Sequence, residues 1–143
     1  MKREIKFRAK RKDNNKWAFG DLVKDNAGGA WIETNLQTWR ENCDDVDAFG
    51  SRLYVDIDTV CQFTGLTDKK GREIYEGDVL RINNGAVICL LVVTWNAEVG
   101  SWCLRFKEES KEGTRPLGRW LCDRDYDIEL TGNIYDNKEL LED

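Results

Sequence analysis

The amino-acid sequence predicts a mainly β protein of the α+β type with one or two short helices, and three observations lead to this class. Short runs of residues alternate between apolar and polar side chains, which is the period of a half-buried strand. Turn residues separate these runs, most clearly at Asn83-Asn84-Gly85, which is typical of a hairpin. The 143 residues are 41% hydrophobic, enough for one domain or for two small subdomains that share a core.

The N-terminal half contains four of the expected strands. Ile5, Phe7 and Ala9 alternate with charged residues, so the first strand has one buried and one solvated face. Residues 35–49 form either a short helix or a polar insertion loop, and the pattern leaves both open. In chain order we expect strands at 5–9, at 17–23 with a break at Gly20-Asp21, at 30–33 and at 53–58, with a hairpin turn at 12–16.

The C-terminal half continues with strands that are separated by tight turns. Asp68 and Gly71 form one turn because the carboxylate can accept backbone N–H groups and glycine tolerates a positive φ. Asn137 is expected to be the N-cap of a final helix over 137–142. We expect strands at 60–64, where Gly65 ends the run, at 74–75, 79–82, 86–96, 102–107 and 120–122, and within 128–135.

The stretch 59–82, together with short segments near both ends of the chain, resembles the YopX family of phages and prophages. The resemblance implies a β-rich N-terminal subdomain, residues 1–64, packed on an SH3-like β-barrel, residues 65–143, in a homo-oligomer. It implies no activity, since the family has no established one. The residues that carry it, and that we expect to be structural, are Gln62, Thr64, Gly65, Leu66, Asp68, Gly71, Ile74, Tyr75, Glu76, Gly77, Asp78, Gly132, Asn133, Ile134 and Tyr135.

Charge and aromatic residues indicate where the protein could bind a partner. Residues 1–16 carry a net charge of +6 and residues 121–143 a net charge of −6, although the whole chain is at −5. These ends form two solvated faces, a head-to-tail subunit contact or, for the basic end, a nucleic-acid patch. Of the aromatic residues, Phe7, Trp31, Phe63, Trp95 and Phe106 are expected in the core. The candidate interaction surface comprises Arg3, Lys6, Arg8, Trp17, Trp39, Trp102 and Trp120.

The sequence offers little for catalysis. It contains no histidine, which excludes Ser-His-Asp and Cys-His arrangements, and it has no P-loop or dinucleotide fingerprint. We therefore expect no enzyme, no metal and no cofactor. A carboxylate-based enzyme is the least favoured of the functional hypotheses. The cysteines are expected to be reduced and packed as small apolar residues; they are Cys43, Cys61, Cys89, Cys103 and Cys122.

Together these features predict a binding protein. No apolar run approaches the roughly 20 residues of a membrane span, and no signal peptide is visible, so we expect a protein of the bacterial cytoplasm without membrane contact. The expected function is that of a phage or prophage accessory protein that acts as an oligomeric protein-binding or scaffolding module, with a phage or host protein as partner. The alternative is a nucleic-acid-binding protein that uses the basic N-terminal strand and exposed tryptophans.

Overall fold

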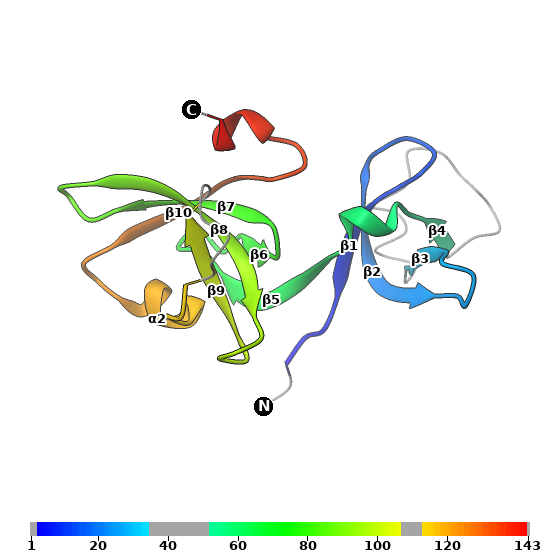
Figure 1. Ribbon diagram of the computed structural model, residues 1–143, viewed down its shortest axis with the longest axis horizontal. Coiled ribbons are helices and arrows are strands. Elements are labelled where there is room, and N and C mark those ends of the chain that lie inside the picture. Colours follow the sequence, from blue (N-terminus) through cyan, green and yellow to red (C-terminus); the bar gives the residue numbers. More distant parts are fainter. Residues whose placement is uncertain (1–2, 35–51, 107–112, 143) are drawn as a thin grey trace. The chain divides into compact units, whose positions relative to one another are not determined.

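A computed structural model describes residues 3–34, 52–106 and 113–142 (Figure 1). The chain divides into two compact units, Met1–Phe63 (unit 1) and Thr64–Asp143 (unit 2), which are described separately. Trp39 and the segment 35–49, expected as helix or insertion, lie outside the described residues. In the described part of the chain, no helix is both long and apolar enough to cross a bilayer.

Unit 1 contains an antiparallel sheet in the order β4-β3-β2-β1. The first two residues of β5, Cys61 and Gln62, pair with β1, after which this strand continues into unit 2 (Figure 1). Gly65 therefore does not end the strand as expected; it has a φ of 85° within it. The bounds are β1 (Phe7–Lys10), β2 (Trp17–Lys24), β3 (Ala30–Glu33), β4 (Arg52–Tyr54) and β5 (Cys61–Thr67).

Two local features of unit 1 differ from expectation. Strand β2 runs through Gly20 without a break, and a β-carbon at Gly20 would collide with the carbonyl oxygen of Glu33 on the paired β3. The strand expected over 53–58 ends early because residues 57–59 form the 3-10 helix η1 (Ile57–Thr59). The Asp56 carboxylate caps this helix by accepting the Asp58 N–H at 3.0 Å. Asp56 thus begins a helix rather than continuing the strand.

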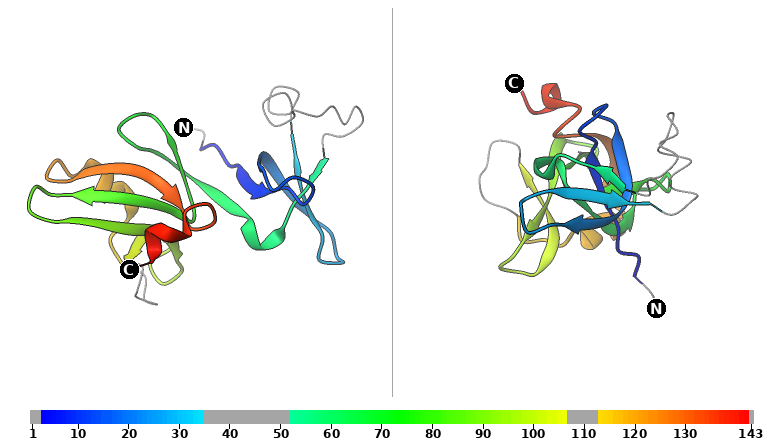
Figure 2. Two further views of the ribbon diagram at one scale, coloured as in Figure 1. Left: turned by 90° about the horizontal axis from the view of Figure 1, so that it is seen from above. Right: turned by 90° about the vertical axis from the view of Figure 1, so that its right-hand side faces the viewer.

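Unit 2 is built on a second antiparallel sheet, in the order β10-β7-β8-β9 (Figures 1 and 2). The mainly β class is therefore confirmed. The SH3-like barrel is not confirmed, because β9 and β10 are the two edges of this sheet and no closed barrel is found among the described residues. The bounds are β6 (Glu73–Tyr75), β7 (Asp78–Asn83), β8 (Ile88–Asn96), β9 (Ser101–Phe106) and β10 (Asp127–Asn133).

Two helices of unit 2 differ from the elements expected at their positions. One forms where a strand was expected, and the other is of a different helix type. Residues 120–122, expected as a strand, belong to the helix α2 (Leu117–Cys122), whose N-cap is Pro116. The prediction was wrong because Leu117, Trp120 and Leu121 recur at helical spacing and all pack on the core. The C-terminal helix is a 3-10 helix, η2 (Lys138–Leu141). Asn137 occupies its N-cap position as expected, but the Asn137 side chain makes no capping hydrogen bond.

The core of unit 2 lies on one face of its sheet. Strand registers place Leu80, Leu91 and Phe106 across from one another, and Ile82 opposite both Cys89 and Ile128. Helix α2 covers the central part of this face through Leu117. The buried cluster consists of Ile74, Leu80, Ile82, Leu91, Val93, Leu104, Leu117 and Ile128.

Candidate functional site: an apolar pocket in unit 2

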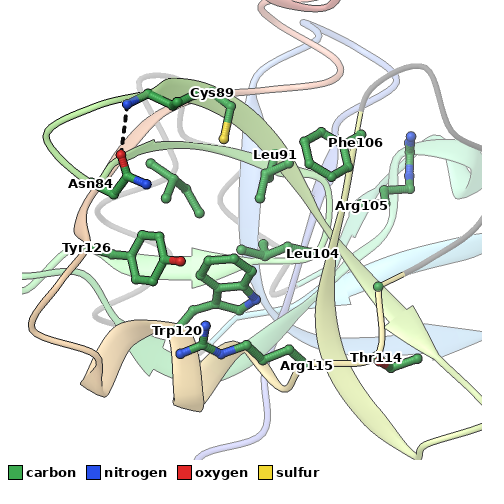
Figure 3. Close-up of a pocket in the computed structure, with 13 residues that line it drawn as sticks. Asn84, Cys89, Leu91, Leu104, Arg105, Phe106, Thr114, Arg115, Trp120 and Tyr126 are labelled. Carbon is green, nitrogen blue, oxygen red and sulfur yellow. Dashed lines mark hydrogen bonds between the residues drawn. The ribbon is translucent and has the colours of Figure 1, made fainter.

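An apolar pocket of about 410 Å³ opens at one end of the core face of unit 2 (Figure 3). Its volume is within the roughly 300–1,000 Å³ range of small-ligand sites. Leu91 of β8 and Leu104 of β9 point into it from the sheet, and Trp120 of α2 and Tyr126 form the opposite wall (Figure 3). The pocket therefore lies where helix α2 stops covering the sheet.

The sheet side of the pocket follows from strand alternation. Cys89 and Leu91 are two residues apart on β8, and Leu104 and Phe106 are two apart on β9, so each pair lies on one face. The register sets Leu91 opposite Phe106. Burial raises the pKa of the Cys89 thiol, which is half-buried in this lining. This side thus offers apolar surface with one neutral thiol.

The helix side of the pocket is a stack of aromatic and charged groups. The rings of Trp120 and Tyr126 meet edge to face with centroids 5.0 Å apart. The Arg115 guanidinium lies 4.4 Å from the Trp120 ring centroid and donates to Asp123 Oδ2 at 2.7 Å. That hydrogen bond is the main reason that the pKa of the Asp123 carboxyl is below its usual range, with a further bond from Asp125 N–H. The stack fixes Arg115 and Trp120 in place.

The rim of the pocket is apolar and exposed. Val87 is 60% exposed and Phe106 is 52% exposed, and both line the pocket. The turn before β8 is held by Asn84, whose Oδ1 accepts the N–H groups of Ala86 and Val87 at 3.0 and 2.8 Å. The turn therefore presents Val87 in a defined position rather than on a loose loop.

Two aromatic residues expected in the core lie at the surface instead. Trp95 is 45% exposed and Phe106 is 52% exposed, because each lies near an end of its strand rather than beneath α2. Trp95 meets Trp102 edge to face across the β8–β9 pair, with ring centroids 5.0 Å apart. Strand alternation showed the correct face, but it could not show how far along each strand the helix cover extends.

The predicted interaction surface is only partly brought together. In unit 1, the Arg8 guanidinium and the Lys10 ammonium lie 4.5 and 4.9 Å from the Trp17 ring centroid. Arg8 is buried, so the expectation that it faces solvent was wrong: its cation stacks on Trp17 within its own sheet. Lys6 lies 5.0 Å from the Phe63 ring centroid.

The other predicted surface residues are placed as follows. Arg3 is exposed. Trp102 and Trp120 are half-buried in unit 2, and only Trp120 of the two lines the pocket. The sequence analysis did not select Val87, Arg115 or Tyr126. No sequence signal selected Arg115, because its place beside the pocket depends on helix α2, where the sequence analysis expected a strand.

The cysteines largely follow expectation. Cys61 and Cys103 are buried and form no disulfide within the described residues, as predicted, whereas Cys122 is exposed at the end of α2. Cys43 lies outside the described residues. Among the residues that the structure describes, no group of three or more Cys, Asp or Glu side chains is arranged to hold a metal ion.

Comparison with known proteins identifies the family. The pattern of the YopX protein family matches residues 6–142. The chain belongs to the YopX family. Its fold resembles the crystal structure of protein EF1440 from Enterococcus faecalis, with a TM-score of 0.58 and 22% identity over 99% of this chain and 100% of that chain. No curated protein sequence matches this YopX protein.

In this YopX protein, Asp68 organises the turn between β5 and β6. Its Oδ1 accepts the N–H groups of Lys70 and Arg72 at 3.0 and 2.9 Å. Its Oδ2 accepts Arg72 Nε at 2.8 Å and the Leu130 N–H at 3.4 Å. Burial raises the pKa of the Asp68 carboxyl, but these bonds outweigh that effect and the pKa lies below its ordinary value of 3.8. Asp68 thus connects the turn to β10.

A second set of YopX motif residues connects the middle of the chain to its end. Gly77, with a φ of 82°, donates its N–H to Val93 O at 3.0 Å and accepts the Ile134 N–H at 2.9 Å. The buried Asp78 accepts the Tyr75 N–H at 2.7 Å. These contacts fit a structural role for the motif. That role stays a prediction, for which Asp68 provides the sharpest test.

Proposed function

We propose that this YopX protein is an oligomeric protein-binding module encoded by a phage or prophage, and that the unit 2 pocket is its docking site. The observation that carries the proposal is the exposed apolar rim, formed by Val87 and Phe106, around an apolar pocket. Exposed apolar side chains that adjoin a pocket are typical of interaction sites, whereas isolated ones are ordinary.

A protein partner accounts for this rim better than a small molecule does. A ligand enclosed by the pocket would contact Leu91, Leu104 and Trp120, but it would leave the outer surfaces of Val87 and Phe106 in water. A polypeptide could place one side chain in the pocket and cover both rim residues with its neighbours. Interfaces of this kind combine a buried apolar anchor with a surrounding rim.

The phage origin and the oligomer are inferred from other observations. The family resemblance suggests the origin, and the exposed Trp95 next to Trp102 gives an apolar surface suited to a subunit contact. A head-to-tail contact between the charged ends is less well supported. Asp123 pairs with Arg115, and Asp127 pairs with Lys69, within unit 2 itself.

The nucleic-acid alternative loses three cations of the basic N-terminal end, which leaves Arg3, Lys12 and Lys16 as its exposed cations among the residues that the structure describes. Arg8, Lys10 and Arg11 are all buried, and the first two stack on Trp17. Phosphate contacts require cations that reach the surface. We therefore keep protein binding as the proposed function.

Two matched valines test the docking site. Val87 precedes β8 at the pocket rim, and Val99, which is 45% exposed, lies in the turn after β8 and does not line the pocket. Tagged wild type, Val87→Asp and Val99→Asp are expressed in the phage-infected host, cross-linked and purified. We expect a stoichiometric protein to be captured by wild type and Val99→Asp and lost by Val87→Asp. Equal capture by all three variants would show that the pocket is not the docking site.

A further inference from the structure

We propose that Asn84 is a site of spontaneous deamidation, at which the backbone nitrogen of Gly85 attacks the side-chain amide and converts Asn84 to aspartate or isoaspartate. The modification itself goes beyond the proposed function and does not depend on it. Its consequence rests on the proposed function, because Asn84 holds the turn that presents Val87 at the pocket rim.

Asn84 is one of three described asparagines that share a turn geometry. The Oδ1 atom of each accepts the backbone N–H groups two and three residues later. For Asn84 the donors are Ala86 and Val87, at 3.0 and 2.8 Å, and the second of these bonds is drawn in Figure 3. The other two are Asn96 at the end of β8 and Asn133 at the end of β10. This geometry folds the amide carbonyl over the next peptide nitrogen, which is the atom that attacks it in deamidation.

Three differences make Asn84 the reactive member of this group. Glycine follows it and has no β-carbon to obstruct the attack, whereas alanine follows Asn96 and isoleucine follows Asn133. Asn84 is exposed, whereas Asn96 and Asn133 are buried. Asn96 Nδ2 donates to Gly113 O at 2.9 Å. Asn133 Nδ2 donates to Asp136 Oδ2 at 3.1 Å. Asn84 Nδ2 bonds to no described residue, so its leaving group is not restrained.

The reaction consumes only water. Hydroxide removes the Gly85 N–H proton, and the nitrogen attacks Asn84 Cγ. A bond from Cγ to this nitrogen forms, the Cγ–Nδ2 bond breaks, and the departing group takes a proton from water and leaves as ammonia. Water then opens the cyclic imide. Cleavage between the nitrogen and Cγ gives aspartate, and cleavage between the nitrogen and the backbone carbonyl carbon gives isoaspartate.

The turn must release one hydrogen bond before the attack. The Gly85 N–H donates to Asn83 Oδ1 at 2.8 Å. Asn84 and Gly85 are both exposed, so water can take the place of this acceptor. The turn can therefore reach the reactive state without disturbing the buried core of unit 2.

The two products differ in their effect on the pocket rim. Aspartate retains a side-chain oxygen that can accept the Ala86 and Val87 N–H groups. Isoaspartate carries the backbone through the former side chain, which adds a methylene to the hairpin between β7 and β8 and removes this acceptor. Because the turn fixes the register of a hairpin, isoaspartate should displace Val87 from its place on the rim.

The test follows the purified full chain during incubation at pH 7 and at pH 9. Mass spectrometry of its peptides quantifies conversion at Asn84, Asn96 and Asn133, and an isoaspartate-specific methyltransferase labels the isoaspartate product. The chain unfolded in urea provides the reference rate for Asn84. Asn84→Ser is the control variant, because serine has an oxygen acceptor but no amide. Circular dichroism verifies that this variant is folded.

We expect Asn84 in the folded chain to convert at least about tenfold faster than Asn96 and Asn133. Its rate should rise with hydroxide concentration between pH 7 and pH 9. Conversion of Asn84 in urea but not in the folded chain would overturn the proposal, because the turn would then protect the amide. Equal rates at Asn84 and Asn96 would also overturn it.

A capture experiment tests the consequence separately. Fresh and aged samples of tagged wild type and of Asn84→Ser are incubated with extract of the phage-infected host. Ageing should lower capture by wild type in proportion to its isoaspartate, and it should not change capture by Asn84→Ser relative to the fresh sample of that variant. Unchanged capture by isoaspartate-containing wild type would overturn the consequence and retain the modification. Capture that ignores Val87→Asp would overturn the docking site, whereas the mass-spectrometric result does not depend on it.

Discussion

The two units build their cores from side chains of different size. In unit 2 the buried cluster consists entirely of Leu, Ile and Val, as Leu80 and Ile82 illustrate. In unit 1 three of the six residues in the described cluster are alanines, namely Ala9, Ala18 and Ala30. Because apolar stabilisation scales with buried area, each core position of unit 1 contributes less than one of unit 2.

Unit 1 also contains a glycine contact and stacked cations. At Gly20 even a β-carbon would collide with the carbonyl oxygen of Glu33. Arg8 and Lys10 cover Trp17 with their charged groups. The difference teaches that the two units are stabilised by different kinds of packing, and the pocket with the exposed Val87 and Phe106 belongs to the unit with the larger aliphatic core.

The largest expected effect is the loss of a core leucine in unit 2. Leu80→Ala should lower the free energy of unfolding by about 2–5 kcal/mol, because Leu80 is fully buried and its removal leaves a cavity. Urea denaturation measures the loss, and hydrogen exchange with mass spectrometry locates it in unit 2. Leu90→Ala is the control, since Leu90 is half-buried on β8 outside the core cluster. Equal losses for both variants would contradict this description of the core.

The next effect concerns the buried carboxylate of unit 2. Asp68→Asn should cost about 1.5–3 kcal/mol at neutral pH, because a charged acceptor is replaced by a neutral one. Since the folded pKa of Asp68 lies below 3.8, its stabilisation is present above about pH 4 and is lost as the pH falls through the folded pKa. Urea denaturation between pH 7 and pH 2 should therefore show the two proteins converging in acid.

Asp125→Asn is the matched control for Asp68. Asp125 is an exposed carboxylate of the same unit, whose backbone N–H bonds to Asp123 Oδ1. Its substitution should change stability by less than about 0.5 kcal/mol. Parallel pH profiles of wild type and Asp68→Asn would show that Asp68 does not connect the turn to β10 in solution.

A smaller effect tests the alanine core of unit 1. Ala18→Leu should destabilise by about 1–3 kcal/mol, because Ala18 is fully buried and added methylenes force the surrounding side chains apart. Faster hydrogen exchange should appear in unit 1 and not in unit 2. Ala97→Leu, in the exposed turn between β8 and β9, should be nearly neutral. A stable Ala18→Leu variant would reveal spare volume in unit 1.

The smallest expected effect concerns how fast the individual cysteines react, measured in a Cys43→Ser background. Cys122 is exposed and should react first with a maleimide, whereas Cys61 and Cys103 should react only on unfolding. Cys89, half-buried in the pocket, should react slowly and faster as the pH rises, because burial raises its thiol pKa. Mass spectrometry follows each site. Labelling of Cys103 before Cys89 would contradict the described strand packing.

The candidate site was only partly predictable. Trp120 belonged to the predicted interaction surface and lines the pocket. Phe106 was assigned to the core, although it lies exposed on the rim. Residues 120–122 were assigned to a strand because three apolar or aromatic residues in a short run fit either periodicity. A helix at that position is what bounds the pocket.

The sequence by itself determined the strand-rich class, the turns around Asp68 and Asn84, and the family. These depend on local chemistry: alternation of side chains, glycine conformations and short-range hydrogen bonds. The tertiary structure decided which aromatics are covered, that Arg8 is buried against Trp17, and that Trp120 and Tyr126 lie across the pocket from Leu91 and Leu104. Those outcomes depend on where α2 ends over the sheet and on strand register, which join residues far apart in the chain.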